Sequence, residues 1–277
     1  MGSFAGQHRL TVTMKNRGTD FAWGHFFDGF TRDRPRTLLL DYDGTLAPFR
    51  VERDQAVIDP PIRDVLERIL RAGRTRVVII SGRALGDLIP LLHLEPLPEL
   101  WGSHGWQRRL PDGQTEDPKL APPVADALAR AREWIRSAEL DSRCEQKPAG
   151  VALHWRGLEA GAVDAIRDRA QETWELLAKT PGLALHPFDG GLELRATGRD
   201  KGYAVARILR DMPAETIIAY AGDDDTDEDA FRALSDRGLS ILVRSDYRPT
   251  AAHRWLRPPE EWLNFLQAWM AADQEGE

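Results

Sequence analysis

The chain has 277 residues, of which 42% are hydrophobic and 29% are charged, and its formal net charge at pH 7 is −7. This length predicts one large domain or a core with a smaller inserted unit, and the composition is typical of a globular rather than a disordered protein. The acidic balance argues against a general nucleic-acid binder. We therefore expect no nucleic-acid partner. No apolar run reaches the roughly 18 residues of a transmembrane helix, so we expect no membrane partner either.

The N-terminal segment and the cysteine content indicate the compartment. Residues 1–18 lack an apolar stretch long enough for a secretory signal. Cys144 is the only cysteine, which excludes an intramolecular disulfide and a multi-thiolate metal site and fits a reducing environment. A cytoplasmic location is therefore expected. Residues 1–32 are predicted to be an N-terminal extension, to which we assign no chemistry.

After this extension, apolar runs alternate with helical patterns, which predicts β-α units and a parallel sheet. Residues 37–40, "TLLL", predict a strand that is buried on both faces. A helix is expected from residue 60 to Gly73, because apolar side chains recur between them at helical spacing and the glycine can terminate it. Residues 76–80, "RVVII", predict a second buried strand.

The pattern changes in the middle of the chain. We predict that residues 110–189 form an inserted α+β domain, a cap, within a core made of residues 33–109 and 190–277. A turn-rich stretch opens this block, and two amphipathic helical segments follow it. Short alternating strands are expected at residues 144–147, 150–156, 183–186 and 191–195.

The β-α pattern then returns. Helices are expected at residues 200–212 and 227–236, and strands at residues 216–222 and 240–243. A final helix carries four apolar side chains at i, i+3, i+4 and i+7: Trp262, Phe265, Leu266 and Trp269. The predicted fold class is therefore α/β, with a doubly wound, mainly parallel, Rossmann-like core and an inserted α+β cap domain.

Polar clusters lie just past the ends of the predicted parallel strands, or at a helix start beside them. They occupy residues 41–45, 81–83, 201–202 and 222–229. Ligands of open α/β sheets bind at that edge, so clusters far apart in sequence can share one site.

Three carboxylates in these clusters, Asp41, Asp43 and Asp223, would concentrate negative charge that is tolerated only with a cation. Oxygen-only ligands favour Mg²⁺, and such a cation would draw in a phosphate. One carboxylate of the pair can then attack phosphorus while the other transfers the proton. Ser81 can donate to a phosphate oxygen, and Lys201 can neutralise charge in the transition state.

Each cluster has another interpretation when taken alone. An acidic pair after a strand is usually a helix cap or a solvated turn, and a lone lysine is usually a surface residue. The acidic run "DDDTDED" is not an EF-hand, because counting from Asp223 the sixth position is Glu228 instead of glycine and the twelfth is Leu234 instead of glutamate. The occurrence of all four clusters in order, each between a strand and a helix, favours the phosphate site.

The motifs "DYDGTLAP", "SGR", "DKG" and "GDDDTDEDAF" resemble, in that order, the four signature motifs of the haloacid dehalogenase-like (HAD) phosphohydrolases, over about Arg36 to Val243. The resemblance implies that Asp41 is the nucleophile and Asp43 the general acid/base. It implies phosphate binding by Thr45, Ser81, Gly82, Arg83 and Lys201. It also implies a Mg²⁺ site made of Asp41, the Asp43 carbonyl and Asp223, with Asp224 and Asp227 as outer or water-mediated candidates.

Within that superfamily, "LDYDGTLAPF", "ELWGSHGWQRR", "CEQKPAGVALHWR" and "GDDDTDEDAF" are similar to trehalose-6-phosphate phosphatases. This resemblance implies an enzyme of trehalose biosynthesis that hydrolyses a small-molecule sugar phosphate, trehalose 6-phosphate, through an aspartyl-phosphate. We separately expect a monomer. It implies that Glu145, Lys147 and Glu193 grip the distal sugar.

Strand alternation supports a polar sugar-facing surface on the cap. Glu145 and Lys147 share one strand face. Glu193 and Arg195 share a face opposite Leu192 and Leu194, and His154 and Arg156 share a face opposite Val151, Leu153 and Trp155. We include His154 and Arg156, together with His104 near the core-to-cap passage, among the expected substrate-binding residues.

Two questions stay open in the sequence. The family commonly carries an acidic residue shortly after the glycine of "GSHG", whereas this chain has Trp106 and Gln107 there, so the local sugar contacts are undefined. The substrate could also be mannosyl-3-phosphoglycerate or another glycosyl phosphate, or the chain could be an inactive, regulatory sugar-phosphate-binding homologue. A receiver-type signalling module is contradicted by the order of the motifs and by the large insert.

Overall fold

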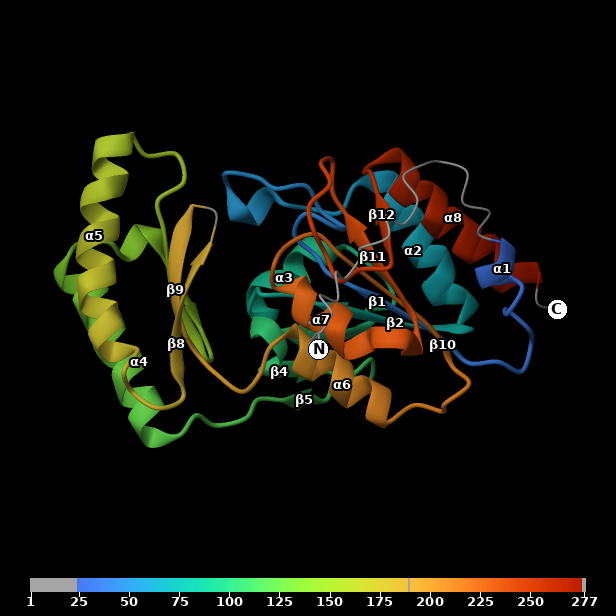
Figure 1. Cartoon of the computed structure of the whole chain (residues 1–277), viewed down its shortest axis with the longest axis horizontal. Helices are drawn as coiled ribbons and strands as arrows, with labels where there is room; N and C mark the ends of the chain where they lie inside the picture. The colour runs from blue at the N-terminus through green and yellow to red at the C-terminus, as the bar shows by residue number, and fades with distance from the viewer. Residues whose placement is uncertain (1–23, 189, 276–277) are drawn as a thin grey trace, which may run out of the picture.

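The computed structural model describes residues 24–188 and 190–275, which form a larger core and a smaller cap that stand side by side (Figure 1). The core is built on an eight-stranded sheet with the order β12-β11-β10-β1-β2-β3-β4-β5. All neighbours from β12 to β3 are parallel, whereas β4 and β5 are added in antiparallel fashion. The core strands are β1 (Arg36–Leu40), β2 (Thr75–Ile80), β3 (Glu99–Gly102), β4 (Gln107–Arg109), β5 (Thr115–Glu116), β10 (Ile217–Gly222), β11 (Leu239–Val243) and β12 (Arg254–Leu256).

Helices cover both faces of this sheet, which confirms the doubly wound prediction. They are α1 (Gly24–Phe27), α2 (Pro60–Ala72), α3 (Leu85–Leu92), α6 (Lys201–Arg210), α7 (Asp227–Leu234) and α8 (Glu260–Glu275). Strand β1 shows why: Leu38 and Leu40 belong to the apolar cluster that includes residues of α2 and α8, whereas Leu39 belongs to the cluster on the α6 and α7 side. The strand is fully buried, as its continuous apolar run predicted.

The cap has a four-stranded antiparallel sheet with the order β6-β7-β9-β8, and two helices pack on one face of it. Its elements are α4 (Pro122–Ser137), β6 (Cys144–Lys147), β7 (Gly150–His154), α5 (Ala160–Leu177), β8 (Leu183–Phe188) and β9 (Gly191–Ala196). Val151 and Leu153 of β7 and Leu192 and Leu194 of β9 are buried against these helices with Trp174. The opposite face of the sheet is consequently the polar one, as strand alternation predicted.

The cap sheet does not coincide with the expected insert of residues 110–189. Strand β9 pairs with both β7 and β8, so the small sheet continues to Ala196. Strand β5, at Thr115–Glu116, still belongs to the large sheet. Pairing between strands, which sequence pattern does not reveal, decides where each strand belongs.

The described part of the chain also has short 3-10 helices, at η1 (Arg53–Gln55), η2 (Ser103–Gly105), η3 (Asp141–Arg143) and η4 (Ser235–Arg237). Among residues 24–188 and 190–275, no helix combines the length and the apolar character needed to span a membrane.

Candidate active site

The clusters predicted from sequence meet at the carboxyl edge of β1 and β10. Asp41 directly follows β1, and its backbone N–H continues the pairing with β10 by donating to Ala221. Lys201, the first residue of α6, donates from Nζ to Asp41 Oδ1 at 2.7 Å, although 160 residues separate the two in the chain. Asp200 caps this helix by accepting from the Tyr203 N–H at 2.7 Å, which fixes where α6 begins beside the strand.

The Asp41 carboxylate is buried and held on two sides. Lys201 binds one oxygen, and the Thr45 hydroxyl lies 3.3 Å from the other. Burial raises the pKa of Asp41 to about 8, and Asp227 adds to this effect, whereas Lys201 opposes it. The carboxylate therefore needs a further positive charge nearby to be ionised, and hence nucleophilic, at neutral pH.

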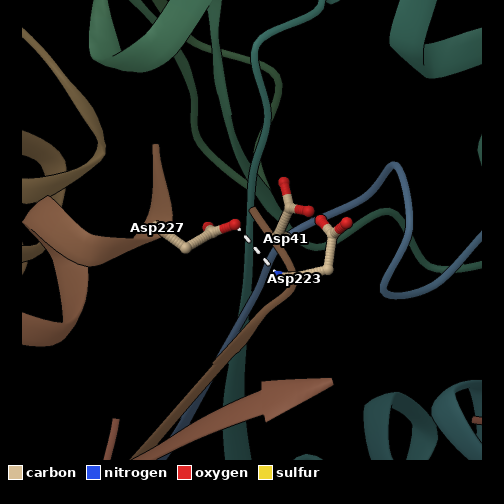
Figure 2. Close-up of side chains that lie close together, drawn as sticks. All are labelled: Asp41, Asp223 and Asp227. Carbon is tan, nitrogen blue, oxygen red and sulfur yellow. Dashed lines mark hydrogen bonds between the residues drawn. The ribbon is translucent and has the colours of Figure 1, made fainter. Parts of the chain in front are cut away.

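Asp227 organises this centre through hydrogen bonds from four donors. Its Oδ1 accepts from Lys201 Nζ at 2.8 Å and from the Tyr220 hydroxyl at 2.5 Å. Its Oδ2 accepts from the backbone N–H groups of Asp223 and Asp224, both at 3.1 Å. Figure 2 shows Asp227 beside the neighbouring Asp41 and Asp223 carboxylates, with the bond to the Asp223 N–H dashed. Because each oxygen already has two donors, this residue is better placed to orient its neighbours than to bind a cation directly.

The residues around Asp223 fit a divalent cation. Asp41, Asp223 and Asp227 each offer an oxygen within 4.8 Å of one another. Asp223 Oδ1 is buried and has no hydrogen-bond partner among the described residues. Burial and the neighbouring Asp41 raise the pKa of Asp223 well above its usual value. Lys201 alone cannot balance three buried carboxylates, and an oxygen-only donor set suits Mg²⁺.

Asp224 behaves differently from Asp223. Burial disfavours its charge, but Lys201 and hydrogen bonds from Thr226 outweigh burial and lower the pKa of Asp224 to about 2. The Thr226 N–H and hydroxyl both donate to its Oδ1, at 2.8 Å and 2.6 Å. Asp224 is thus a stable anion at the rim of the centre.

Gly44 makes the approach of Asp223 possible. It has φ +87°, and a Cβ at this position would overlap the Asp223 carboxylate. We expect Gly44→Ala to displace Asp223 and to lower the hydrolytic activity expected of this centre by roughly 100-fold, since a misplacement of about 1 Å can cost that much. The steady-state rate of phosphate release from a sugar phosphate, compared between Gly44→Ala and the wild type, measures this loss of activity.

Gly73 provides the matched control for this variant. It also has positive φ, +67°, but a Cβ there would meet nothing within 4 Å. Gly73→Ala should therefore lose about 1 kcal/mol of stability from backbone strain while keeping full activity. Equal losses of activity in the two variants would show that strain, and not the position of Asp223, explains the effect.

Asp43 is held by Arg83, the residue that the resemblance assigned to phosphate. Arg83 Nε and Nη2 donate to the two Asp43 oxygens at 2.7 Å and 2.6 Å, a bidentate ion pair. The Ser81 hydroxyl oxygen accepts from the Arg83 N–H at 3.1 Å, so its proton is available to donate elsewhere. Gly82 lies against His104, where a Cβ would stand 2.6 Å from a ring carbon.

A cleft of about 360 Å³ separates the core from the cap. Most of the predicted site residues line it: Asp41, Asp43, Gly82, Arg83, His104, Glu145, Lys147, His154, Arg156, Glu193, Lys201 and Asp224. Thr45, Ser81, Asp223 and Asp227 do not line it and are buried. The cleft thus joins the carboxylate centre on the core to the charged face of the cap.

The expected sugar-binding residues form one ionic network on that face. Ala152 of β7 lies between Glu145 of β6 and Glu193 of β9 in the register, and its small side chain leaves room between the two carboxylates. Lys147 Nζ is 2.7 Å from Glu193 Oε1 and 3.7 Å from Glu145 Oε2. Burial disfavours charge on Glu145, but Lys147, His154 and Arg53 outweigh it and lower the pKa of Glu145 to about 2. The network therefore presents charged acceptors to the cleft at neutral pH.

The core-to-cap passage brings His104 into this network. His104 has φ +54° and places Nε2 3.6 Å from Glu193 Oε2. Burial lowers the pKa of His104 to about 4, which holds the ring neutral. Trp106 packs against the apolar cluster of the cap, and Gln107 accepts from the Leu85 N–H at 3.0 Å. The two residues at the departure from the family pattern thus have structural contacts.

Sequence reasoning missed several residues that line the cleft. Phe49, Arg50 and Arg53 come from the loop after β1, and His186, Pro187 and Phe188 come from β8. Arg195, Asp225, Thr226 and Asp229 complete the missed set. Asp225, Thr226 and Asp229 lie in the polar cluster at residues 222–229, and Phe49 ends the motif "LDYDGTLAPF", so these positions did carry a signal. For His186 and Phe188 the available signal was strand alternation, which places them on one face.

A family model described as trehalose-phosphatase matches residues 39–258. The chain belongs to the trehalose-phosphatase family. Trehalose-phosphate phosphatase of Mycobacterium marinum is 33% identical over 255 residues, which cover 86% of this chain and 62% of that protein. The Mycobacterium tuberculosis protein of the same name is 30% identical over 234 residues, which cover 78% of this chain and 56% of that protein. The chain thus spans about 60% of the length of these curated relatives.

Solved structures share the fold of this trehalose-phosphatase family member. The C-terminal domain of Candida albicans trehalose-6-phosphate phosphatase superposes with a TM-score of 0.75 at 18% identity, covering 90% of this chain and 97% of that one. A trehalose-6-phosphate phosphatase related protein gives a TM-score of 0.70 at 23% identity, and the match covers 87% of this chain and 100% of that one. These likenesses confirm the predicted α/β fold. The family model and the mycobacterial relatives confirm the family prediction.

Proposed function

We propose that this protein is a Mg²⁺-dependent phosphatase that hydrolyses trehalose 6-phosphate to trehalose and phosphate. The observation that carries the proposal is the Asp41–Lys201 pair, which lies beside Asp43 and Asp223 at one wall of a cleft whose other wall is the ionic cap face. The trehalose-phosphate phosphatase activity named for the mycobacterial relatives supports the choice of substrate. A monomeric state and a cytoplasmic location stay predictions.

The reaction divides between Asp41 and Asp43. An Asp41 oxygen attacks phosphorus, and the bond to the sugar oxygen breaks while Asp43, as the acid, gives that oxygen a proton. The aspartyl-phosphate is then attacked by a water whose proton returns to Asp43, which releases phosphate and restores Asp41. Lys201 stabilises the charge on the nucleophile and the phosphoryl group.

Asp41 and Asp223 would hold the Mg²⁺, with the Asp43 carbonyl as the further protein ligand that the family resemblance implies. When bound, the ion supplies positive charge that balances the buried carboxylates and the phosphoryl oxygens. Asp227 keeps Lys201 and the Asp223 backbone in position, and Asp224 is a candidate for a water-mediated contact.

The cap provides sugar selectivity in this proposal. Glu145, Lys147 and Glu193 carry donors and acceptors that can pair with hydroxyl groups, and His104, His154 and Arg156 line the same cleft. Its volume falls in the range of roughly 300–1,000 Å³ that is usual for small-molecule sites. Cap closure over the disaccharide would exclude bulk water from the reacting phosphate.

Phosphate release from a panel of sugar phosphates with Mg²⁺ tests the assignment. We expect trehalose 6-phosphate to have the highest kcat/KM, ahead of glucose 6-phosphate and mannosyl-3-phosphoglycerate. Equal, slow turnover of every substrate would refute the trehalose assignment. A preference for another member of the panel would move the assignment to that sugar, and absence of turnover with every substrate would favour a regulatory binding protein.

Removal of a cap carboxylate should affect the disaccharide selectively. We expect Glu193→Gln to lower kcat/KM for trehalose 6-phosphate by roughly 10- to 100-fold, because hydroxyl partners in the cleft are lost. Turnover of p-nitrophenyl phosphate, which is too small to reach the cap, should change less than about threefold. Glu172→Gln, on the exposed side of α5, is the matched control. A uniform loss with both substrates would contradict a role in sugar recognition.

A further inference from the structure

The core loop at residues 48–57 meets the cap on the side away from the two chain connections. In Figure 1 both connections cross near one end of the small sheet, and the loop, coloured blue, reaches toward the other end. Two contacts cross the cleft there. Arg53 Nη2 lies 2.5 Å from Glu145 Oε1, and the Arg156 guanidinium is 6.0 Å from the centre of the Phe49 ring.

The Arg53–Glu145 ion pair joins an accessible core residue to a buried cap residue. The Glu145 side chain is 5% exposed, whereas that of Arg53 is 33% exposed. Within the cap, the other oxygen of Glu145 is shared by His154 at 3.3 Å and Lys147 at 3.7 Å. Arg53 is therefore the partner of Glu145 that only a cap docked on the core can supply, and separation would replace this ion pair with water at the Glu145 oxygen.

The same residue is tied to the reaction centre through its backbone. The Arg53 carbonyl accepts from Arg83 Nη1 at 2.8 Å. The two remaining donor groups of Arg83 hold both oxygens of Asp43. A continuous chain of contacts thus runs from Glu145 on the cap through Arg53 and Arg83 to the carboxylate that transfers the proton.

We propose that Arg53 is a positioning residue that couples docking of the cap to the placement of Asp43. This inference rests on the proposed phosphatase function. Docking of the cap holds the Arg53 side chain through Glu145, which fixes the backbone carbonyl that anchors Arg83 and therefore Asp43. Proton transfer to the sugar oxygen then becomes efficient only when the cap is closed over the substrate.

Three substrates separate this role from sugar recognition. Trehalose 6-phosphate and glucose 6-phosphate both expel a sugar alkoxide that needs a proton, whereas p-nitrophenyl phosphate expels a stable phenolate. We expect Arg53→Ala to lower kcat by about tenfold or more for both sugar phosphates and by less than about threefold for p-nitrophenyl phosphate, which also reports that the variant is folded. Arg53→Lys should restore part of the loss, because it keeps the charge.

A second measurement follows the cap itself. Small-angle scattering should give a larger radius of gyration for Arg53→Ala than for the wild type, because the cap spends less time docked. Arg71→Ala, which removes an exposed ion pair with Glu67 on α2, is the charge-matched control and should match the wild type in both measurements. A double-mutant cycle with Glu145→Ala should be non-additive for glucose 6-phosphate, since both changes break the same link.

Other outcomes overturn the proposal. A rise in KM for trehalose 6-phosphate alone, with glucose 6-phosphate unchanged, would make Arg53 a sugar-binding residue. Equal losses with all three substrates, or an additive cycle, would remove the link to Asp43. If the wild type hydrolyses another sugar phosphate instead of trehalose 6-phosphate, the proposed substrate is wrong, and the same comparison with that sugar phosphate and p-nitrophenyl phosphate still decides the role of Arg53.

Discussion

Asp41→Asn should abolish catalysis, with phosphate release falling by roughly 10³-fold or more, because a neutral amide oxygen cannot form the phosphoryl ester. The substitution keeps the shape of the side chain, and Lys201 retains its bond to Asp227, so the fold should persist. Steady-state phosphate release and intact-protein mass spectrometry after rapid quenching measure the two parts of the prediction. A phosphorylated species should appear with the wild type and be absent from the variant.

The control for Asp41→Asn is Asp64→Asn, which makes the same change on α2, where the side chain is 71% exposed. Its activity should stay within about twofold of the wild type, as is usual for surface changes away from a site. Wild-type turnover in Asp41→Asn would contradict the mechanism and would leave Asp43 or an activated water as the attacking group.

Metal binding should have the second large effect, on stability as well as on activity. Chelation should abolish turnover, and saturating Mg²⁺ should stabilise the wild type by about 3 kcal/mol at 100 times its Kd. For a protein of this size that corresponds to a rise in Tm of roughly 5–10 °C. Scanning calorimetry with and without Mg²⁺ measures the shift.

Asp223→Asn should separate two effects of the Asp223 carboxylate: its cost to the stability of the metal-free protein and its contribution to Mg²⁺ binding. Without metal, the variant should be more stable than the wild type by about 1–2 kcal/mol, because it removes a buried carboxyl group that is costly to ionise and whose Oδ1 has no partner among the described residues. With Mg²⁺, it should show little thermal shift and little activity. If Mg²⁺ raises the Tm of this variant as much as that of the wild type, the ion does not bind at Asp223. If the variant is less stable than the wild type without metal, other groups already compensate the Asp223 carboxylate.

The proposed catalytic pair, Asp41 and Asp43, illustrates what local sequence can reveal. The run of leucines before Asp41 predicted a strand buried on both faces, and the structure divides Leu38, Leu39 and Leu40 between the two apolar clusters. Because the end of a buried strand lies at the sheet edge, the positions of Asp41 and Asp43 followed from a pattern within a few residues. The alternation in β6 and β9 predicted the charged face of the cap in the same way.

The acidic run before α7 marks the limit of such reasoning. Sequence analysis treated Asp224 and Asp227 alike, as outer or water-mediated candidates for the metal. In the structure Asp227 accepts bonds from four donors, whereas Asp224 is held by Thr226 and faces the cleft. Residues three apart in a turn and a first helical turn point in directions that depend on the backbone path, which composition does not specify.

The sequence alone thus determined the β-α units that carry the polar clusters, the edge at which those clusters gather and the polar face of the cap, because periodicity and turn residues act over a few positions. It did not predict α3 or the short strands β3, β4, β5 and β12. Only the tertiary structure decided the partners: Arg83 binds Asp43 across 40 residues, and Arg53 crosses the cleft to Glu145. Ion pairs of this kind depend on where separate loops and domains meet. That arrangement is set by the packing of the whole chain and leaves no local signal in the sequence.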